Sequence, residues 1–313
     1  MRVAILDDIH HAYDGTAGVQ RLRTRAEVQI LTAPFGDASA LRGFDALVAN
    51  RERTRFTRDL LEELTDVRII VQTGNHAYHV DLAAAAACGI VVGKASGGYS
   101  IGAAELAIGL AIAVMRRIPE TQAAMGKGAW PQPMTPVLHG KPLGIVGLGR
   151  VGQHVARLGA AFGMRVLAWG PHLTSARALA AGAEASSLDD LVAEADVVSI
   201  HATLAPSSRG LIDARRLALM KPTACLINTS RGPVVDEGAL VQVLTAGRIG
   251  GAGLDVFDQE PLPGDHPLRT LPNVVVTPHI GWPTDAAYAS FADAACDVLF
   301  AFMDGRPVPQ FTS

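Results

Sequence analysis

The stretch LGIVGLGRVG, residues 143–152, decides the fold of this chain. Residues 143–146 are apolar enough for a short buried strand, and residues 153–162 follow with a helical pattern. The residues expected on one face of that helix are Val155, Ala156, Leu158, Gly159 and Phe162. A G-x-G-x-x-G run between a strand and a helix predicts a dinucleotide-binding turn, whereas the same glycines without that context would indicate only a tight turn.

Each glycine of this run has a physical task. Gly147 permits the tight turn, Gly149 lets the backbone approach a pyrophosphate, and Gly152 lets the helix pack closely on its strand. The N-terminus of the helix directs its N–H groups at the phosphates. The expected cofactor contacts in this run are Gly147, Gly149, Arg150, Val151 and Gly152.

The end of the next strand departs from the usual NAD site. About 20 residues after the glycine run, such sites carry an Asp or Glu for the ribose 2′-hydroxyl. Here that position is Gly170, followed by Pro171 and His172, so no carboxylate is present to repel a 2′-phosphate. His172, with Thr174 or Ser175, could meet that phosphate, while the position of Arg177 is not evident from the sequence. We expect NAD or NADP, with the missing acid favouring NADP; alternatively, Gly170 only forms a turn and NAD binds through its other contacts.

Composition limits the class of protein. The 313 residues are enough for two domains, and the net charge of −3 gives no electrostatic case for binding nucleic acid or an anionic membrane. The three cysteines are far apart and form no CxxC, which indicates neither a disulfide framework nor a zinc site. The N-terminus reads as a strand and not as a signal peptide, and the apolar segment 101–115 is too short to span a bilayer. We expect a cytoplasmic protein.

Strand and helix patterns alternate along the whole chain, which favours parallel sheets. The expected strands are 3–6, 28–31, 46–48, 68–72 and 90–92, then 143–146, 165–169, 197–201, 224–228, 253–256 and 274–277. Two doubly wound α/β domains follow from this: a flavodoxin-like substrate domain, residues 1–98 and 285–313, and a Rossmann cofactor domain, residues 99–284. Hinges are expected near Gly97-Gly98 and Trp282, with a ligand cleft between the domains.

Three polar residues end later strands of the second series: Arg231, Glu260 and His279. Reduction of a 2-keto acid needs one of each type. An Arg binds the carboxylate and polarises the carbonyl, a His protonates the keto oxygen, and a Glu orients the His. Taken singly, Arg231 could be a surface or phosphate-contacting residue, Glu260 a turn residue and His279 the cap of a strand.

Together with their surroundings, these residues resemble the D-isomer-specific 2-hydroxyacid dehydrogenase family over nearly the whole chain. The matching segments are LGIVGLGRVG, INTSRGPVVDEGAL, GAGLDVFDQEPLP and VVVTPHIGW. Looser matches are RERT at 51–54, VQTGNHAYHVDLAAAAACGIVV and AAELAIGLAIAVMRR. The resemblance implies an NAD(P)-dependent oxidoreductase acting on a small 2-hydroxy or 2-keto acid.

The resemblance also implies roles for individual residues. The catalytic residues would be Arg231, Glu260 and His279. Asp255 would hold the nicotinamide carboxamide, and Ala202, Thr203, Thr229 and Ser230 would line the nicotinamide side. Apart from the resemblance, the expected cofactor contacts include Gly170, His172 and Gly281. The loop Thr73-Gly74-Asn75 would offer backbone N–H groups to the substrate carboxylate. The segment from Gly102 to Arg117 and the region around Trp130 resemble the dimer-forming part of the family, so a homodimer is expected.

Some positions differ from the family pattern. The loop 75–78 lacks the usual glycines, and the chain ends at Ser313, which leaves no room for the regulatory domain of some phosphoglycerate dehydrogenases. Arg51 and Arg53 resemble a pair that meets a substrate phosphate in some relatives, although a solvated pair flanking Glu52 is favoured. Trp282 either closes the substrate pocket or packs against a core or a partner subunit.

Other interpretations carry less weight. His76 and His79 have helical spacing, and Asp7, Asp8, His10 and His11 cluster after the first strand, but we expect no metal and interpret the second group as a solvated loop. A rival class is a dinucleotide-sensing corepressor, which the absence of an added interaction segment disfavours. A formate- or phosphite-type dehydrogenase shares the scaffold, but residues 74–78 contain no lysine, which a phosphite enzyme would favour.

Overall fold

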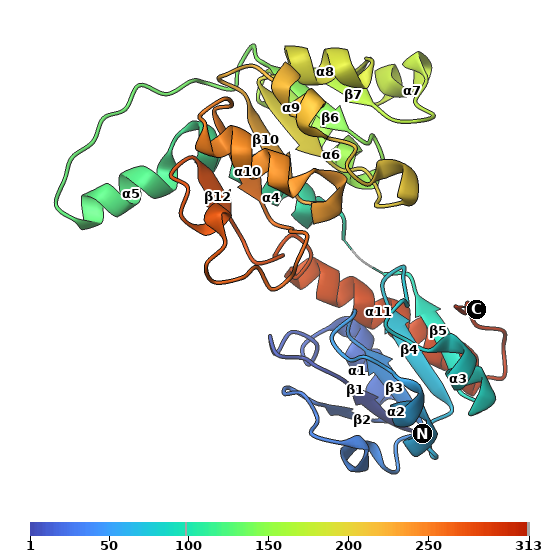
Figure 1. Ribbon diagram of the computed structural model, residues 1–313. Coiled ribbons are helices and arrows are strands. Elements are labelled where there is room, and N and C mark those ends of the chain that lie inside the picture. Colours follow the sequence, from blue (N-terminus) through green and yellow to red (C-terminus); the bar gives the residue numbers. More distant parts are fainter. Residues whose placement is uncertain (98, 312–313) are drawn as a thin grey trace. The chain divides into compact units, whose positions relative to one another are not determined.

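The structure is a computed structural model that describes residues 1–97 and 99–311, so the expected hinge residue Gly98 lies outside the described residues. The chain divides into two compact units. Unit 1 comprises Met1–Tyr99 and Pro283–Ser313, and unit 2 comprises Ser100–Trp282. Each unit is built around its own parallel sheet (Figure 1).

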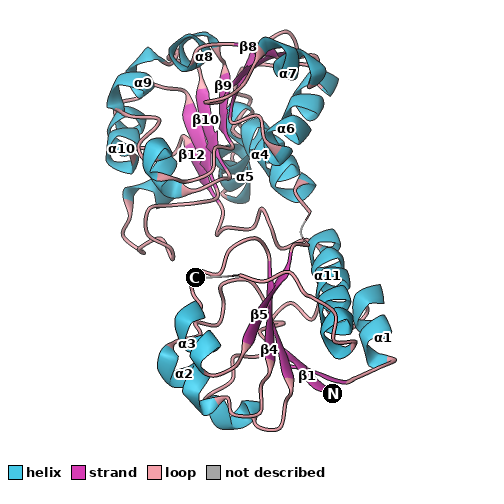
Figure 2. Ribbon diagram, turned by 90° about the vertical axis from the view of Figure 1, so that its right-hand side faces the viewer, coloured by secondary structure: helices cyan, strands magenta, loops and turns pink. Residues whose placement is uncertain are grey.

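Unit 1 contains a five-stranded sheet in the order β2-β1-β3-β4-β5, with every neighbouring pair parallel. The strands are β1 (Arg2–Ile5), β2 (Glu27–Ile30), β3 (Ala46–Ala49), β4 (Ile69–Thr73) and β5 (Val91–Ala95). The helices are α1 (Ala17–Arg23), α2 (Arg58–Glu63), α3 (Leu82–Ala87) and α11 (Asp285–Met303). Figure 2 shows α2 and α3 on one face of the sheet and α1 and α11 on the other. This strand order is flavodoxin-like, and its reversal lies between β1 and β3.

Helix α11 comes from the end of the chain but belongs to the core of unit 1. Its buried side chains include Tyr288, Phe291 and Leu299, and it packs on α1, β4 and β5. Gly18 of α1 allows the close helix contact, because a Cβ there would lie 2.3 Å from the backbone of Ala292. By length and composition α11 could cross a membrane, yet half of its most apolar window is buried inside the protein, as expected for a core helix.

Unit 2 contains a seven-stranded parallel sheet in the order β12-β11-β10-β9-β6-β7-β8. The strands are β6 (Pro142–Val146), β7 (Arg165–Trp169), β8 (Glu184–Ala185), β9 (Val197–Ile200), β10 (Cys225–Asn228), β11 (Gly251–Leu254) and β12 (Val274–Val276). The helices are α4 (Ile101–Met115), α5 (Ile118–Gly126), α6 (Arg150–Ala161), α7 (Ser175–Ala180), α8 (Leu188–Glu194), α9 (Ala214–Leu219) and α10 (Glu237–Thr245). The order in which successive strands are added to the sheet reverses between β6 and β9, which is the Rossmann arrangement.

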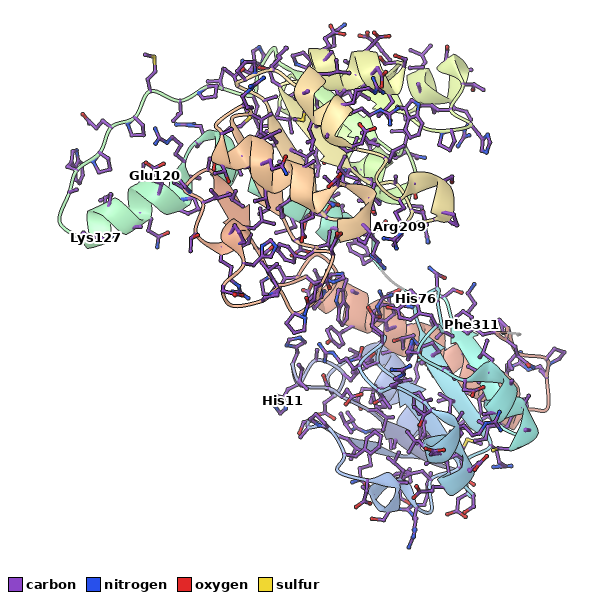
Figure 3. The ribbon with its side chains drawn as sticks, in the orientation of Figure 1. His11, His76, Glu120, Lys127, Arg209 and Phe311 are labelled. Carbon is purple, nitrogen blue, oxygen red and sulfur yellow. The ribbon has the colours of Figure 1, made fainter. Side chains whose placement is uncertain are left out.

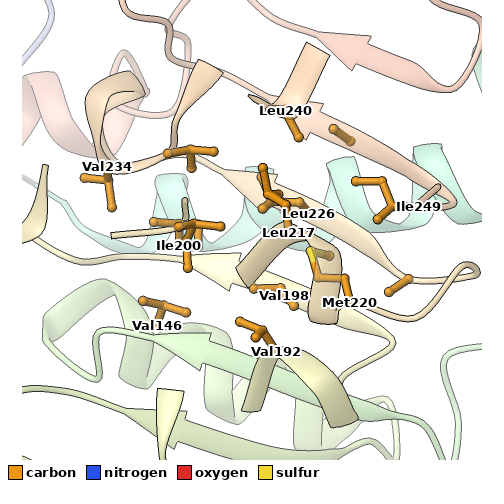
Figure 4. Close-up of a cluster of buried hydrophobic side chains, with 14 of the residues drawn as sticks. Val146, Val192, Val198, Ile200, Leu217, Met220, Leu226, Val234, Leu240 and Ile249 are labelled. Atoms are coloured by element: carbon orange, nitrogen blue, oxygen red, sulfur yellow. The ribbon is translucent and has the colours of Figure 1, made fainter. Parts of the chain in front are cut away.

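Two apolar layers hold this sheet. One contains strand residues such as Val198 and Leu226 packed against Leu217 of α9 and Leu240 of α10 (Figure 4). The other lies under α4 and α6 on the opposite face. At the amino ends of the strands, Asp196 accepts hydrogen bonds from Lys141 and Lys221, at 3.0 and 2.9 Å. Because the Asp196 side chain is only 9% exposed, this is a nearly buried ionic group with both oxygens occupied.

The two doubly wound sheets confirm the predicted fold class, and every expected strand is present within a few residues. Two details of the prediction are wrong. Phe162 does not lie on the buried face of the helix after the glycine run, because α6 ends at Ala161 and Phe162 is 43% exposed. The short strand β8 was not expected, since both of its residues are exposed and give no apolar pattern.

Candidate active site

The centre of the candidate site in unit 2 is a direct contact between two residues that follow different strands. His279 Nδ1–H donates to Glu260 Oε2 at 2.7 Å, and Glu260 Oε1 accepts from the Phe257 N–H at 3.0 Å. The His279 side chain is 25% exposed, so the ring is partly accessible from solvent. Because Nδ1 is committed to a carboxylate, the ring is held in one orientation, as an acid–base histidine requires.

The charge state of Glu260 suits this arrangement. Burial raises the pKa of its carboxyl group, but the hydrogen bonds from His279 and Phe257 and the positive charges of His279 and Arg231 outweigh burial and leave the pKa below the ordinary 4.5. Glu260 is therefore a carboxylate at neutral pH and can accept the hydrogen bond from His279 Nδ1.

Asp255 holds the loop that carries His279. Its carboxylate is buried and accepts from Thr277 Oγ1 at 2.5 Å and from the N–H groups of Ile280 and Gly281, each at 2.8 Å. These bonds enclose His279, whose backbone is in the left-handed region with φ of 56°. Burial raises the pKa of Asp255, and the bonds it accepts oppose that rise. In this structure Asp255 therefore positions the loop of His279, the candidate acid–base residue, in addition to the cofactor role that the resemblance implies.

Arg231 lies at the end of β10, next to the loop of Glu260. Asn228 Nδ2 donates to the Arg231 carbonyl at 3.0 Å, and Arg231 Nη1 donates to the Ser230 carbonyl at 2.7 Å. Gly232 allows this turn to touch the neighbouring loop, because a Cβ there would lie 2.0 Å from the Phe257 carbonyl carbon. The structure thus brings Glu260 and His279 into contact and places Arg231 near enough to lower the pKa of Glu260.

The glycine run forms a cradle at the point where the strand order reverses. Gly147 has φ of 104° and lies against the backbone of Ala202, while a Cβ at Gly152 would meet the Gly147 carbonyl oxygen at 2.2 Å. Among the described residues, in contrast, no atom beyond the chain neighbours of Gly149 lies within 4 Å of its Cβ position. The open space in front of Gly149, at the start of α6 with Arg150 and Val151 next in the chain, fits a dinucleotide pyrophosphate.

The neighbouring strand ends complete the cradle. Ser230 Oγ donates to the Ala202 carbonyl at 2.5 Å, and the Thr203 carbonyl accepts from Ser208 Oγ at 2.7 Å. The hydroxyl of Thr229 is buried without a hydrogen-bond partner among the described residues. A buried polar group of this kind needs a partner, and a bound cofactor would supply one. The residues present therefore fit a nicotinamide dinucleotide.

The turn after β7 has a cation beside it. Arg177 Nη1 donates to the His172 carbonyl at 3.1 Å, which gives the arginine the position that the sequence left undefined. Thr174 is used as the N-cap of α7 through the Arg177 N–H, so its hydroxyl oxygen is already engaged. At Gly170 a Cβ would meet only the Cβ of Leu173, at 3.5 Å, so the absence of a side chain is not forced by packing.

The predicted substrate residues in unit 1 lie at the carboxyl ends of β3 and β4. Thr73 is fully buried: its Oγ1 accepts from the Arg51 N–H and donates to the Ala49 carbonyl, both at 2.9 Å. The Gly74 N–H donates to the Ala95 carbonyl at 3.0 Å, so it is used inside the sheet and is not offered to a ligand. The structure therefore leaves Arg51 and Asn75 as the residues of this group suited to substrate contact.

Two expectations about unit 1 are wrong. Asp7 and Asp8 are not solvated; they are 5% and 1% exposed, with Asp7 accepting from Thr54 Oγ1 and Asp8 from the N–H groups of Ala12 and Tyr13. Arg51 and Arg53 are not a solvated pair either, since the Arg51 side chain is 14% exposed and Arg53 donates to the Asp7 carbonyl. His10 and His11 are exposed, and His11 is labelled in Figure 3.

The histidines after β4 do not share a helix, because residues 74–80 form a loop. His79 is buried and its Nε2 bonds to Gln72 Oε1 at 3.0 Å; burial lowers the pKa of His79. Gln72 Nε2 in turn donates to the Arg51 and Thr73 carbonyls, each at 2.9 Å. Sequence reasoning missed Gln72, since a polar residue inside a buried strand was its only signal. Trp282, the last residue of unit 2, is partly buried.

Comparison with known proteins gives a consistent picture. Residues 108–281 match the model for "D-isomer specific 2-hydroxyacid dehydrogenase, NAD binding domain". A D-3-phosphoglycerate dehydrogenase of Methanocaldococcus jannaschii is 35% identical over 92% of this chain and 54% of its own length. A glyoxylate reductase of Aeropyrum pernix is 38% identical over 83% of this chain and 80% of its own. The structure of apo D-lactate dehydrogenase from Escherichia coli is 27% identical, with a TM-score of 0.87 and 99% of both chains covered. The chain spans about half the length of the curated phosphoglycerate dehydrogenases that it matches.

Proposed function

Since the chain belongs to the D-isomer specific 2-hydroxyacid dehydrogenase family, we propose that it transfers a hydride between NAD(P) and C2 of a small D-2-hydroxy acid or 2-keto acid. The observation that carries this proposal is the 2.7 Å contact between His279 and Glu260, at the end of the sheet that also bears the glycine cradle. An oriented histidine beside a dinucleotide site is what carbonyl reduction requires.

The chain's own residues would work as follows in the reductive direction. The nicotinamide, when bound, supplies the hydride. Arg231 binds the substrate carboxylate and polarises the keto group with its remaining N–H groups. His279 donates the Nε2 proton to the oxygen as negative charge develops there, and Glu260 stabilises the imidazolium until that moment. In the oxidative direction His279 accepts the same proton.

The decisive experiment is an initial-rate assay that follows cofactor absorbance with glyoxylate, hydroxypyruvate, pyruvate, phenylpyruvate and 3-phosphohydroxypyruvate. We expect turnover of at least one of these acids, and His279→Ala should lose most of kcat while cofactor affinity is retained. Cofactor binding without turnover of any acid would refute the proposal and favour a dinucleotide-sensing protein. Activity of His279→Ala within a few-fold of the native protein would refute the acid–base assignment.

For the cofactor, we propose NADP in preference to NAD. The support is Gly170, which presents no carboxylate, together with Arg177, which lies beside the same turn through its bond to the His172 carbonyl. An arginine near this position can accommodate a 2′-phosphate. Arg177→Ala should weaken NADPH more than NADH, and Gly170→Asp, for which there is space, should reverse the preference. Equal use of both cofactors by the native protein would refute this choice.

We further propose a homodimer that works in the cytoplasm. Large apolar side chains are exposed along α5 and the segment after it, where Trp130 is 77% exposed and Met134 99% exposed. Such a patch is typical of an interaction surface. All three cysteines, Cys88, Cys225 and Cys296, are free thiols, which suits a reducing compartment. Sedimentation analysis tests the dimer, and a monomer at micromolar concentration would refute it.

A further inference from the structure

The three arginines of the segment 51–55 have different surroundings. Arg53 Nη1 donates to the Asp7 carbonyl at 2.7 Å, at the end of β1. Arg55 is exposed and lines a hollow beside Ile9 and Phe35. Arg51 instead lies over Gly74: the position of a Cβ at Gly74 would be 2.5 Å from Arg51 Nη1. The cation beside the candidate substrate loop is therefore Arg51.

The backbone of Arg51 is fixed by hydrogen bonds to both its N–H and its carbonyl. The Arg51 N–H donates to Thr73 Oγ1, and its carbonyl accepts from Gln72 Nε2, which His79 orients in turn. These bonds fix the left-handed conformation of Arg51, with φ of 59°. Because this backbone is fixed, the Arg51 side chain extends from a defined position next to the loop.

The charge of Arg51 has a partner already. Glu52 Oε2 lies 3.4 Å from Arg51 Nε and 3.6 Å from His76 Nε2. His76 belongs to the loop after β4 (Figure 3). The Arg51 side chain is 14% exposed and that of Glu52 is 30% exposed, so water screens the pair only partly. The negative charge of Glu52 therefore offsets the positive charge of Arg51 beside Gly74.

We propose that Glu52 is a specificity-determining residue that excludes substrates with a second negative charge. This inference rests on the proposed function and, in addition, on the role in substrate binding that the resemblance implies for the loop after β4. A phosphate or second carboxylate that approached Arg51 would meet the Glu52 carboxylate at the same guanidinium and would be repelled by it. The favoured substrate is a 2-keto acid with one carboxylate and an uncharged substituent, although several of the relatives are named D-3-phosphoglycerate dehydrogenase.

The test compares hydroxypyruvate with 3-phosphohydroxypyruvate, which differ only by the phosphate. The native protein should favour hydroxypyruvate in kcat/KM. In Glu52→Gln, which keeps the size of the side chain, kcat/KM for the phosphorylated acid should rise by roughly tenfold or more, because a charge a few ångströms away has been removed. The change should appear in KM, while kcat/KM for hydroxypyruvate stays within a few-fold.

Two controls separate the possible failures. Glu62→Gln removes a carboxylate from an exposed pair with Arg58 on α2, so it should leave both substrates unchanged. Inhibition of hydroxypyruvate reduction by inorganic phosphate should strengthen in Glu52→Gln and not in Glu62→Gln. A native protein that prefers the phosphorylated acid, or a Glu52→Gln variant with an unchanged substrate ratio, would overturn this inference and leave the proposed function standing. Absence of turnover with every keto acid would instead refute the proposed function.

Discussion

Substitution of Gly149 and of Gly152 by alanine should separate cofactor binding from stability within one six-residue turn. At Gly152 the new Cβ would lie 2.2 Å from the Gly147 carbonyl oxygen, which belongs to a backbone with φ of 104° that only glycine adopts readily. Overpacking of this kind costs about 1–3 kcal/mol and outweighs the gain of up to about 1 kcal/mol for Ala over Gly in a helix. At Gly149 the Cβ would meet no atom in the part of the chain that the structure describes, so the free energy of unfolding should change by less than about 1 kcal/mol.

Cofactor affinity should change in the opposite order, with a larger loss in Gly149→Ala than in Gly152→Ala. The Cβ at position 149 would occupy the space that we assign to the pyrophosphate, so Kd for the dinucleotide should rise about 10–100-fold, or about 1.4–2.8 kcal/mol. Thermal unfolding without cofactor and titration of dinucleotide fluorescence measure the two effects on the same samples. The reasoning fails if Gly149→Ala lowers Tm as much as Gly152→Ala does, or if it binds the dinucleotide with native affinity.

Three further predictions follow from named contacts. Asp196→Asn should cost about 2–4 kcal/mol of unfolding free energy by leaving its two lysine partners unpaired. Because those lysines hold the folded pKa of Asp196 below 3.8 against the effect of burial, the contribution of Asp196 to stability is complete above about pH 4–5 and is lost as the pH falls further. The free energy of unfolding measured in urea should therefore fall less between pH 5 and 3 in the variant than in the native protein. Glu260→Gln should lower kcat for reduction about 10–100-fold, since the His279 ring loses the carboxylate that orients it; a kcat within a few-fold of the native value would contradict this. Gly232→Ala should displace the Phe257 loop and reduce kcat with little change in cofactor affinity, whereas Gly238→Ala, whose Cβ has only an ordinary contact at 3.6 Å, serves as the neutral control.

Most of the fold could be predicted from the sequence because each strand other than β8 corresponds to a short apolar run between turn residues. The failures have local causes. Strand β8 is two exposed residues, Glu184 and Ala185, paired with β7 at one edge, and no apolar periodicity marks it. Phe162 continues the apolar spacing of α6, but the turn at Gly163 ends the helix before it.

The contact between Glu260 and His279 agrees with the orienting role predicted for the glutamate, since parallel strands bring their carboxyl ends to one edge. The residues whose surroundings were wrongly predicted have hydrogen-bond partners far away in the sequence. Asp7 was expected in solvent because acids usually are, yet its partner Thr54 lies 47 residues away. The position of Arg51 depends equally on Gln72 and on a left-handed backbone, which no local pattern signals.

The return of α11 to unit 1 has a consequence for synthesis on the ribosome. The continuous segment Ser100–Trp282 can complete its sheet as soon as it emerges, whereas β4 and β5 must wait for residues 285–303 before that face is covered. The N-terminal 99 residues are therefore made first but finish folding last, with an apolar sheet face exposed during the interval. A nascent chain that stalls before Asp285 should be the species that chaperones bind and proteases remove.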